Sequence, residues 1–206
     1  ITPYEYKKRV DDGSVTEVLA KHEVKRGDVF YLPAGRVHAI CGGILLAEVQ
    51  QSSDVTYRIF DYNRPGMDGK PRELHTELAA EALDFNVEDE YRTHYSTLDN
   101  RANVIIESPY FSVRVTEMET SFHRNLIKYD SFVISMCLSG DCKIKVRSTG
   151  DEVMLREGWS VLIPAAVADY DITPLNGKSR VRDAFIDKKD RSIGACITRF
   201  LHITNK

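Results

Sequence analysis

The chain has 206 residues, of which 42% are hydrophobic and 29% are charged. These fractions match folded globular domains and exclude a disordered, collagen-like or coiled-coil chain. With 28 basic and 31 acidic residues the formal net charge is −3, so there is no basic surplus for a phosphate backbone and we expect no nucleic-acid partner. The mostly apolar stretches fall well short of the roughly 20 residues of a membrane helix, so we expect no membrane partner either.

The four cysteines predict free thiols. They are too few for a secreted disulfide scaffold, and no two of them form a C-x-x-C pair. This usage is typical of a reducing compartment, and we therefore expect a cytoplasmic protein. The residues are Cys41, Cys137, Cys142 and Cys196.

The N-terminal part reads as helix followed by short strands. Thr2 is a helix-capping residue, Pro3 suits the first helical position, and Gly13 is expected to end the helix. A second helix is predicted to begin at Ser14. Runs rich in β-branched and aromatic residues, broken by turns, then predict four strands. They are Val29–Leu32, His38–Cys41, Ile44–Val49 and Tyr57–Tyr62.

The middle of the chain predicts a loop, one helix and a connection. Proline and glycine are frequent in residues 63–72, which indicates a loop. Apolar residues at helical spacing predict an amphipathic helix over Leu74–Phe85. The polar segment Asn86–Arg101 is expected to connect two domains.

From Val104 onward the hydrophobic period is two. Phe111, Val113 and Val115 alternate with polar residues, and strand-like runs recur about every 8–12 residues. This spacing is typical of a β-sandwich or barrel. The sequence therefore predicts a mainly β fold with a few short helices, divided into residues 1–100 and 101–206.

One motif in the first part carries chemistry. The segment Gly27–His38 has the form G-x5-P-x-G-x2-H, in which glycine and proline set tight turns on either side of a strand. It resembles the second motif of cupin jelly-roll barrels, whose histidine is a metal ligand. The resemblance implies that His38 enters a strand with its imidazole directed into the barrel. The same frame returns over Gly158–Asp169, with Ala166 in place of the glycine and Asp169 in place of the histidine. The chain is thus expected to hold the second part of a catalytic cupin in residues 1–100 and a degenerate, metal-free cupin-like domain in 101–206.

The segment after His38 narrows the resemblance. The run E-x-Q-Q-S-S-D-x-T-Y-R, from Glu48 to Arg58, closely resembles type I phosphomannose isomerases, also called mannose-6-phosphate isomerases. The similarity covers essentially the whole chain and is densest over Gly27–Arg64. It implies one Zn²⁺ with His38 as a ligand, Glu48 as an active-site acid and Arg58 as the catalytic arginine. The implied reaction interconverts mannose 6-phosphate and fructose 6-phosphate, with a sugar phosphate as the small-molecule partner.

The chain departs from the family in its ligand set. The family binds zinc through a Gln-x-His pair, a Glu and a later His, and only the later His has a counterpart here, His38. We therefore expect the remaining ligands upstream of Ile1, in the first half of the catalytic barrel. On this reading the chain corresponds to the C-terminal two-thirds of the enzyme and is expected to be inactive in isolation, with zinc absent from it.

Two other functions are compatible with a cupin. A non-catalytic sugar-binding module would bind a sugar phosphate without turnover. Another metal-dependent cupin enzyme, such as a dioxygenase, would carry an upstream H-x-H and no paired acid and arginine after the ligand histidine. Because both Glu48 and Arg58 follow His38, the sequence favours the isomerase over both alternatives.

Overall fold

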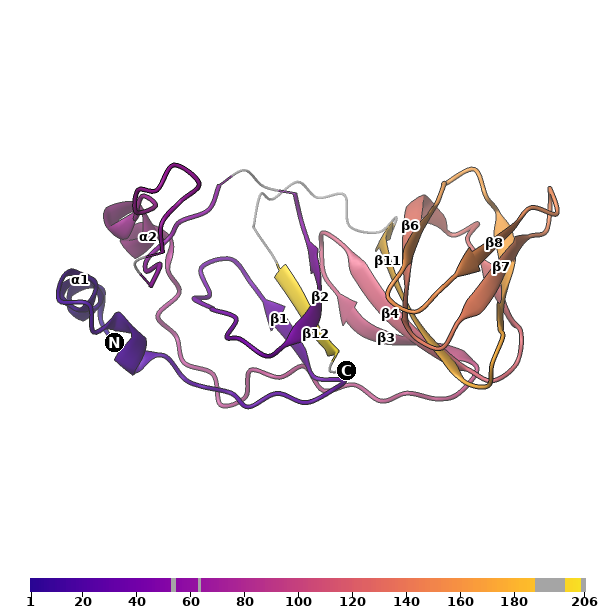
Figure 1. The fold of residues 1–206 in the computed structure, drawn as a ribbon, viewed down its shortest axis with the longest axis horizontal. Coiled ribbons are helices and arrows are strands. Elements are labelled where there is room, and N and C mark those ends of the chain that lie inside the picture. Colours follow the sequence, from indigo (N-terminus) through magenta and orange to yellow (C-terminus); the bar gives the residue numbers. More distant parts are fainter. Residues whose placement is uncertain (53–54, 63, 188–198, 205–206) are drawn as a thin grey trace. The chain divides into compact units, whose positions relative to one another are not determined.

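The computed structural model describes residues 1–52, 55–62, 64–187 and 199–204, with side chains except those of residues 130 and 199–204. The chain forms two compact units. The first comprises Ile1–Arg92 with the C-terminal segment Ala195–Lys206, and the second comprises Thr93–Gly194 (Figure 1). Strands dominate and the helices are few and short, so the prediction of a mainly β fold is confirmed. Within the described part of the chain, no helix is long and apolar enough to cross a membrane.

The first unit contains a three-stranded antiparallel sheet whose middle strand comes from the C-terminal end of the chain. Its strand order is β1-β12-β2. The sequence-based division assigned this C-terminal segment to the second part, whereas its strand pairs with both strands of the first unit. The three strands are β1 (Val29–Leu32), β2 (Leu45–Gln50) and β12 (Arg199–Thr204).

The helical part of the first unit packs around a small core. The hydroxyl of Thr2 accepts a hydrogen bond from the Glu5 N–H at 3.2 Å, which caps the first helix as predicted. Buried Tyr6, Val15 and Ala79 form the core, and Ile59 and Phe60 pack against it. The elements are α1 (Pro3–Asp11), the 3₁₀ turn η1 (Val15–Val18) and α2 (Thr76–Ala82).

Two of the four strands predicted for this part are absent. Residues 38–41 form no strand. All four residues are exposed, so their apolar side chains do not form the buried face of a sheet. Residues 57–62 form no strand either. Ile59 and Phe60 are adjacent yet both pack on the same helical core, which the alternating faces of a regular strand would not allow. The second predicted helix forms only the turn η1, and the helix predicted over Leu74–Phe85 is the shorter α2.

The second unit consists of two antiparallel sheets, as the alternation from Val104 onward predicts. The larger sheet has the order β3-β4-β11-β6-β9 and the smaller β5-β10-β7-β8. Its strands are β3 (Arg101–Glu107), β4 (Ser112–Met118), β5 (Phe122–Asn125), β6 (Tyr129–Ser139), β7 (Cys142–Val146), β8 (Glu152–Leu155), β9 (Ser160–Ile163), β10 (Asp169–Pro174) and β11 (Ser179–Asp187).

Both sheets contribute side chains to one apolar core. Val133 and Val181 from the larger sheet and Ile144 and Ile172 from the smaller belong to the same buried cluster. Burial of such a cluster is the main favourable term in folding, and it fixes the two sheets of this unit against each other. Three cysteines lie in the described residues: Cys137 and Cys142 are buried, Cys41 is exposed, and Cys196 lies outside that range.

Candidate functional site

The turn before His38 is anchored on the end of α2. Gly35 has φ +81°, a conformation that favours glycine. The Asp84 N–H donates to the Gly35 carbonyl at 3.1 Å. A Cβ added to Gly35 would lie 2.6 Å from the Ala82 carbonyl oxygen, so no larger residue fits without a backbone shift. The glycine of the motif is therefore required both by its conformation and by its close approach to the helix.

A charged side chain secures the same turn. The guanidinium of Arg36 lies 3.5 Å from Asp84 and 3.3 Å from Glu88, and it stands 5.0 Å from the centre of the Tyr91 ring. Its side chain is only 12% exposed. These contacts fix the segment from which His38 projects.

His38 is exposed, which corrects the expectation of an imidazole pointing into a barrel from a strand. Its Nδ1 lies 3.0 Å from the Arg36 carbonyl oxygen. Because a carbonyl can only accept, Nδ1 carries the proton, and in the neutral ring Nε2 then carries the lone pair. A histidine whose Nδ1–H is held by a backbone carbonyl is the usual arrangement of a metal ligand that binds through Nε2.

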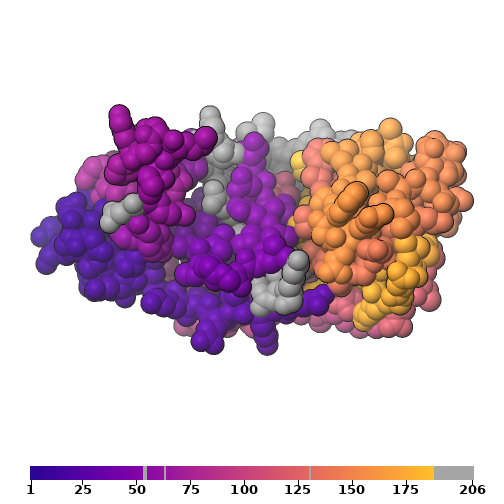
Figure 2. Space-filling model, viewed as in Figure 1, coloured from indigo at the N-terminus to yellow at the C-terminus, as the bar shows by residue number. Residues whose placement is uncertain are grey.

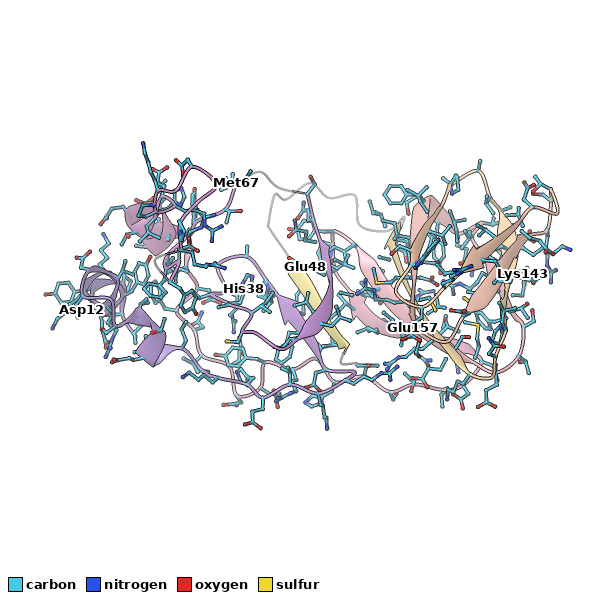
Figure 3. The ribbon with its side chains drawn as sticks, in the orientation of Figure 1. Asp12, His38, Glu48, Met67, Lys143 and Glu157 are labelled. Atoms are coloured by element: carbon cyan, nitrogen blue, oxygen red, sulfur yellow. The ribbon has the colours of Figure 1, made fainter. Side chains whose placement is uncertain are left out.

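Glu48 lies on β2, level with Phe30 of β1, because both residues pair with position 201 of β12. Leu46, on the same face of β2, packs against the buried Phe30 and Leu32. Glu48 itself is exposed. Residues of β2 lie at the surface of the first unit in the space-filling view (Figure 2). Figure 3 places His38 and Glu48 in the part of this unit that holds its sheet.

Arg58 is held by the segment that leads into α2. Its N–H donates to Nδ1 of His75 at 3.1 Å, and its carbonyl accepts from the His75 N–H at 2.8 Å. Its guanidinium donates to the Glu73 carbonyl at 3.2 Å. The contacts of Arg58 thus run to the helical part of the unit, whereas those that fix His38 and Glu48 run to the turn and the sheet.

A buried carboxylate follows Arg58. Asp61, whose side chain is 8% exposed, accepts hydrogen bonds from Arg72 Nε at 2.6 Å and from Arg64 at 2.8 Å. The bond from Arg72, aided by Arg64 against the effect of burial, lowers the pKa of Asp61 to about 2. This cluster orders the loop that precedes α2. The sequence pattern alone does not mark Asp61 or His75 as site residues. Arg72 lies 11 residues from Asp61 and Arg58 lies 17 residues from His75, and a contact across an irregular loop leaves no periodic signal in the sequence.

The residues present do not form a zinc site by themselves. Across residues 1–52, 55–62, 64–187 and 199–204, no group of three or more His, Cys, Asp or Glu side chains is placed to hold a metal ion. His38 offers one imidazole nitrogen, and structural or catalytic zinc takes at least three protein ligands. Ser53 and Asp54, in the run between Glu48 and Arg58, lie outside the described residues.

Comparison with known proteins gives similar sequences and a similar structure, although no family model matches the chain. The probable mannose-6-phosphate isomerase GmuF of Bacillus subtilis is 32% identical over 83% of this chain and 54% of its own length. Mannose-6-phosphate isomerase ManA of the same species is 31% identical over 79% of this chain and 51% of its own. The chain spans about half the length of these curated relatives.

The crystal structure of the mannose 6-phosphate isomerase from Bacillus subtilis matches 90% of this chain and 57% of its own, with a TM-score of 0.76 and 29% identity. The resemblance drawn from the sequence motifs is confirmed by these comparisons, and so is the cupin-type fold.

Proposed function

We propose that the protein carrying this chain interconverts mannose 6-phosphate and fructose 6-phosphate. The observation that supports this most strongly is the similarity to the Bacillus subtilis isomerases, which covers 79% to 83% of the chain in sequence and 90% in structure. The segments that carry His38, Glu48 and Arg58 are also those in which the sequence motifs of that family are densest.

The reaction moves a proton between C1 and C2 of the sugar through a cis-enediol. It needs a group that takes up and returns the proton, and a group that holds the negative charge developing on the substrate oxygens. Arg58 suits the second role, because a guanidinium stays charged at all physiological pH values and presents several donors in a fixed plane. Its main chain is fixed at both the N–H and the carbonyl.

Glu48 is proposed for proton transfer. A carboxylate can accept a proton from carbon and return it to the neighbouring position, provided that it lies within hydrogen-bond reach of the substrate. The pairing of β2 with β12 fixes the backbone at Glu48, and the exposed side chain is accessible to a small ligand.

His38 is proposed as one ligand of a zinc ion, through Nε2. The described residues supply no complete metal site, and the roles given to Arg58 and Glu48 use only the side chains of this chain. The expectation that the other ligands lie upstream of Ile1 stays a prediction, as do a cytoplasmic location and a sugar phosphate as the small-molecule partner.

The test is an isomerase assay on the protein expressed from its complete reading frame. Formation of fructose 6-phosphate from mannose 6-phosphate is measured for the wild type, Arg58→Ala and the control Arg26→Ala, which removes an exposed arginine of the same unit. Arg58→Ala is expected to lower kcat by about 100-fold or more, the usual effect of removing a charge-stabilising donor, while Arg26→Ala leaves it unchanged.

Two outcomes would contradict the proposal. Wild-type turnover by Arg58→Ala would remove Arg58 from the mechanism. Binding of mannose 6-phosphate without any turnover by the wild type would favour the sugar-binding module instead.

A further inference from the structure

The side chain of His75 accepts a hydrogen bond from the backbone of Arg58. Its Nδ1 accepts the Arg58 N–H at 3.1 Å, and its own N–H donates to the Arg58 carbonyl at 2.8 Å. The main chain of Arg58 is therefore held at both polar groups by one residue, 17 positions further along the chain. We propose that His75 is a positioning residue for Arg58, an inference that rests on the catalytic role proposed for Arg58.

The hydrogen bond from the Arg58 N–H determines which nitrogen of the His75 imidazole carries the proton. A backbone N–H can only donate, so Nδ1 must carry its lone pair, and the proton of the neutral ring lies on Nε2. The Tyr57 ring packs beside it, with the two ring centres 6.0 Å apart. Only an acceptor at this position satisfies the Arg58 N–H, and an apolar side chain of the same size leaves that donor without its partner.

The support for His75 comes from the helical core. His75 precedes the first residue of α2, and its carbonyl accepts the Ala79 N–H at 2.8 Å. Ala79 is fully buried against Tyr6 and Val15. The position of the Arg58 backbone is thus set by a packed cluster rather than by a free loop.

The guanidinium is oriented from the same segment. Arg58 Nη1 donates to the Glu73 carbonyl, two residues before His75. A guanidinium has five donor hydrogens, and this bond uses one of them to fix the plane in which the others lie. A small displacement of a group that stabilises charge can lower a rate by about 100-fold, so the two anchors act on kcat more than on substrate binding.

The proposal is tested with two variants of similar size in the protein expressed from its complete reading frame. His75→Asn keeps an acceptor oxygen near the place of Nδ1, whereas His75→Leu removes it. His94→Leu, which removes an exposed imidazole of the second unit, is the control. His75→Leu is expected to lower kcat about 10-fold with KM within about twofold, His75→Asn to recover most of the rate, and His94→Leu to behave as the wild type.

Amide hydrogen exchange at Arg58 gives a second readout that does not depend on activity. The exchange rate is expected to rise in His75→Leu and to stay near the wild-type value in His75→Asn. If the amide behaves in this way but the wild type shows no isomerase activity, the proposed function fails while the anchoring of Arg58 stands. Equal kcat for His75→Leu and the wild type, equal losses in Leu and Asn, or global unfolding of the Leu variant would each overturn the positioning role.

Discussion

Arg124 and Asp183 form an ion pair inside the second unit, with 2.6 Å between Arg124 Nη2 and Asp183 Oδ2. Their side chains are 7% and 4% exposed. Burial opposes the charge on Arg124, but Asp183, Tyr170 and Tyr129 together outweigh it, and the pKa of the guanidinium is raised. Ser135 donates a further hydrogen bond to the same carboxylate. Charged groups thus occupy the interior of the second unit, in which the repeat of the G-x5-P-x-G-x2-H motif has Asp169 in place of the histidine.

Removing one partner of this pair is expected to destabilise the second unit strongly. Asp183→Asn leaves Arg124 charged and buried, a situation that typically costs about 3–5 kcal/mol. The free energy of unfolding can be measured by urea titration with the fluorescence of Trp159, the single tryptophan, which belongs to this unit. A double replacement, Arg124→Met with Asp183→Leu, is expected to be milder than Asp183→Asn alone, because the buried charge of Arg124 is removed together with its partner.

The matched control is the exposed pair of Lys143 and Glu152, with 3.0 Å between the charged atoms. Glu152→Gln is expected to change the free energy of unfolding by less than about 1 kcal/mol. A loss for Asp183→Asn no larger than that for Glu152→Gln would contradict the structural role given to the buried pair.

Gly35→Ala is expected to destabilise the turn that carries His38. An alanine there meets both the strain of a positive φ, roughly 1–2 kcal/mol, and the Ala82 carbonyl. Gly13 separates the two effects, because it has φ +79° but no atom within 4 Å of an added Cβ. Thermal denaturation should show a larger loss for Gly35→Ala than for Gly13→Ala. Equal losses of stability would mean that the Ala82 carbonyl moves away from the new Cβ at no cost.

Strands of the second unit such as β7 and β10 could be predicted from the sequence because their side chains alternate between buried and less buried positions, which a period of two records directly. The order of the strands in the first unit could not be predicted from the sequence. β12 inserts between β1 and β2 from about 150 residues away, and such pairing leaves no trace in a local pattern. The strand predicted over Tyr57–Tyr62 fails for a similar reason: its apolar residues serve the helical core and not a sheet.

The residues of the candidate site are predicted from a sequence motif and not from the contacts that surround them. His38, Glu48 and Arg58 were chosen from their spacing and from the resemblance that this spacing carries. The groups that support them, among them His75 for Arg58 and Asp84 for the turn at Gly35, act through backbone contacts across the fold. Contacts between residues far apart in the sequence leave no local pattern, so only the structure could identify these groups.

The zinc assignment leads to a prediction about metal content. In the protein expressed from its complete reading frame, His38→Asn is expected to bind less than one zinc per chain under conditions in which the wild type binds one, because zinc sites need their full ligand set. Elemental analysis after dialysis measures this, with His94→Asn as the control. Residues 1–206 alone are expected to hold little zinc, and stoichiometric zinc with turnover in that segment would show that its ligand set is complete.

The Asp61 cluster predicts an acid-sensitive loop. The pKa of Asp61 is lowered from 3.8 to about 2, chiefly by the hydrogen bond from Arg72. Because the folded state holds the proton less tightly than the unfolded state, the carboxylate stabilises the loop fully above about pH 4, and this contribution is lost as the pH falls from about 4 to 2. Amide exchange in residues 64–72, corrected for the intrinsic rate at each pH, should accelerate over that range in the wild type. Asp61→Asn should exchange faster at every pH above 4 and show no further acceleration there, whereas Asp68→Asn, at an exposed aspartate of the same loop, should follow the wild type. The same pH dependence in the wild type and Asp61→Asn would show that another group controls the loop.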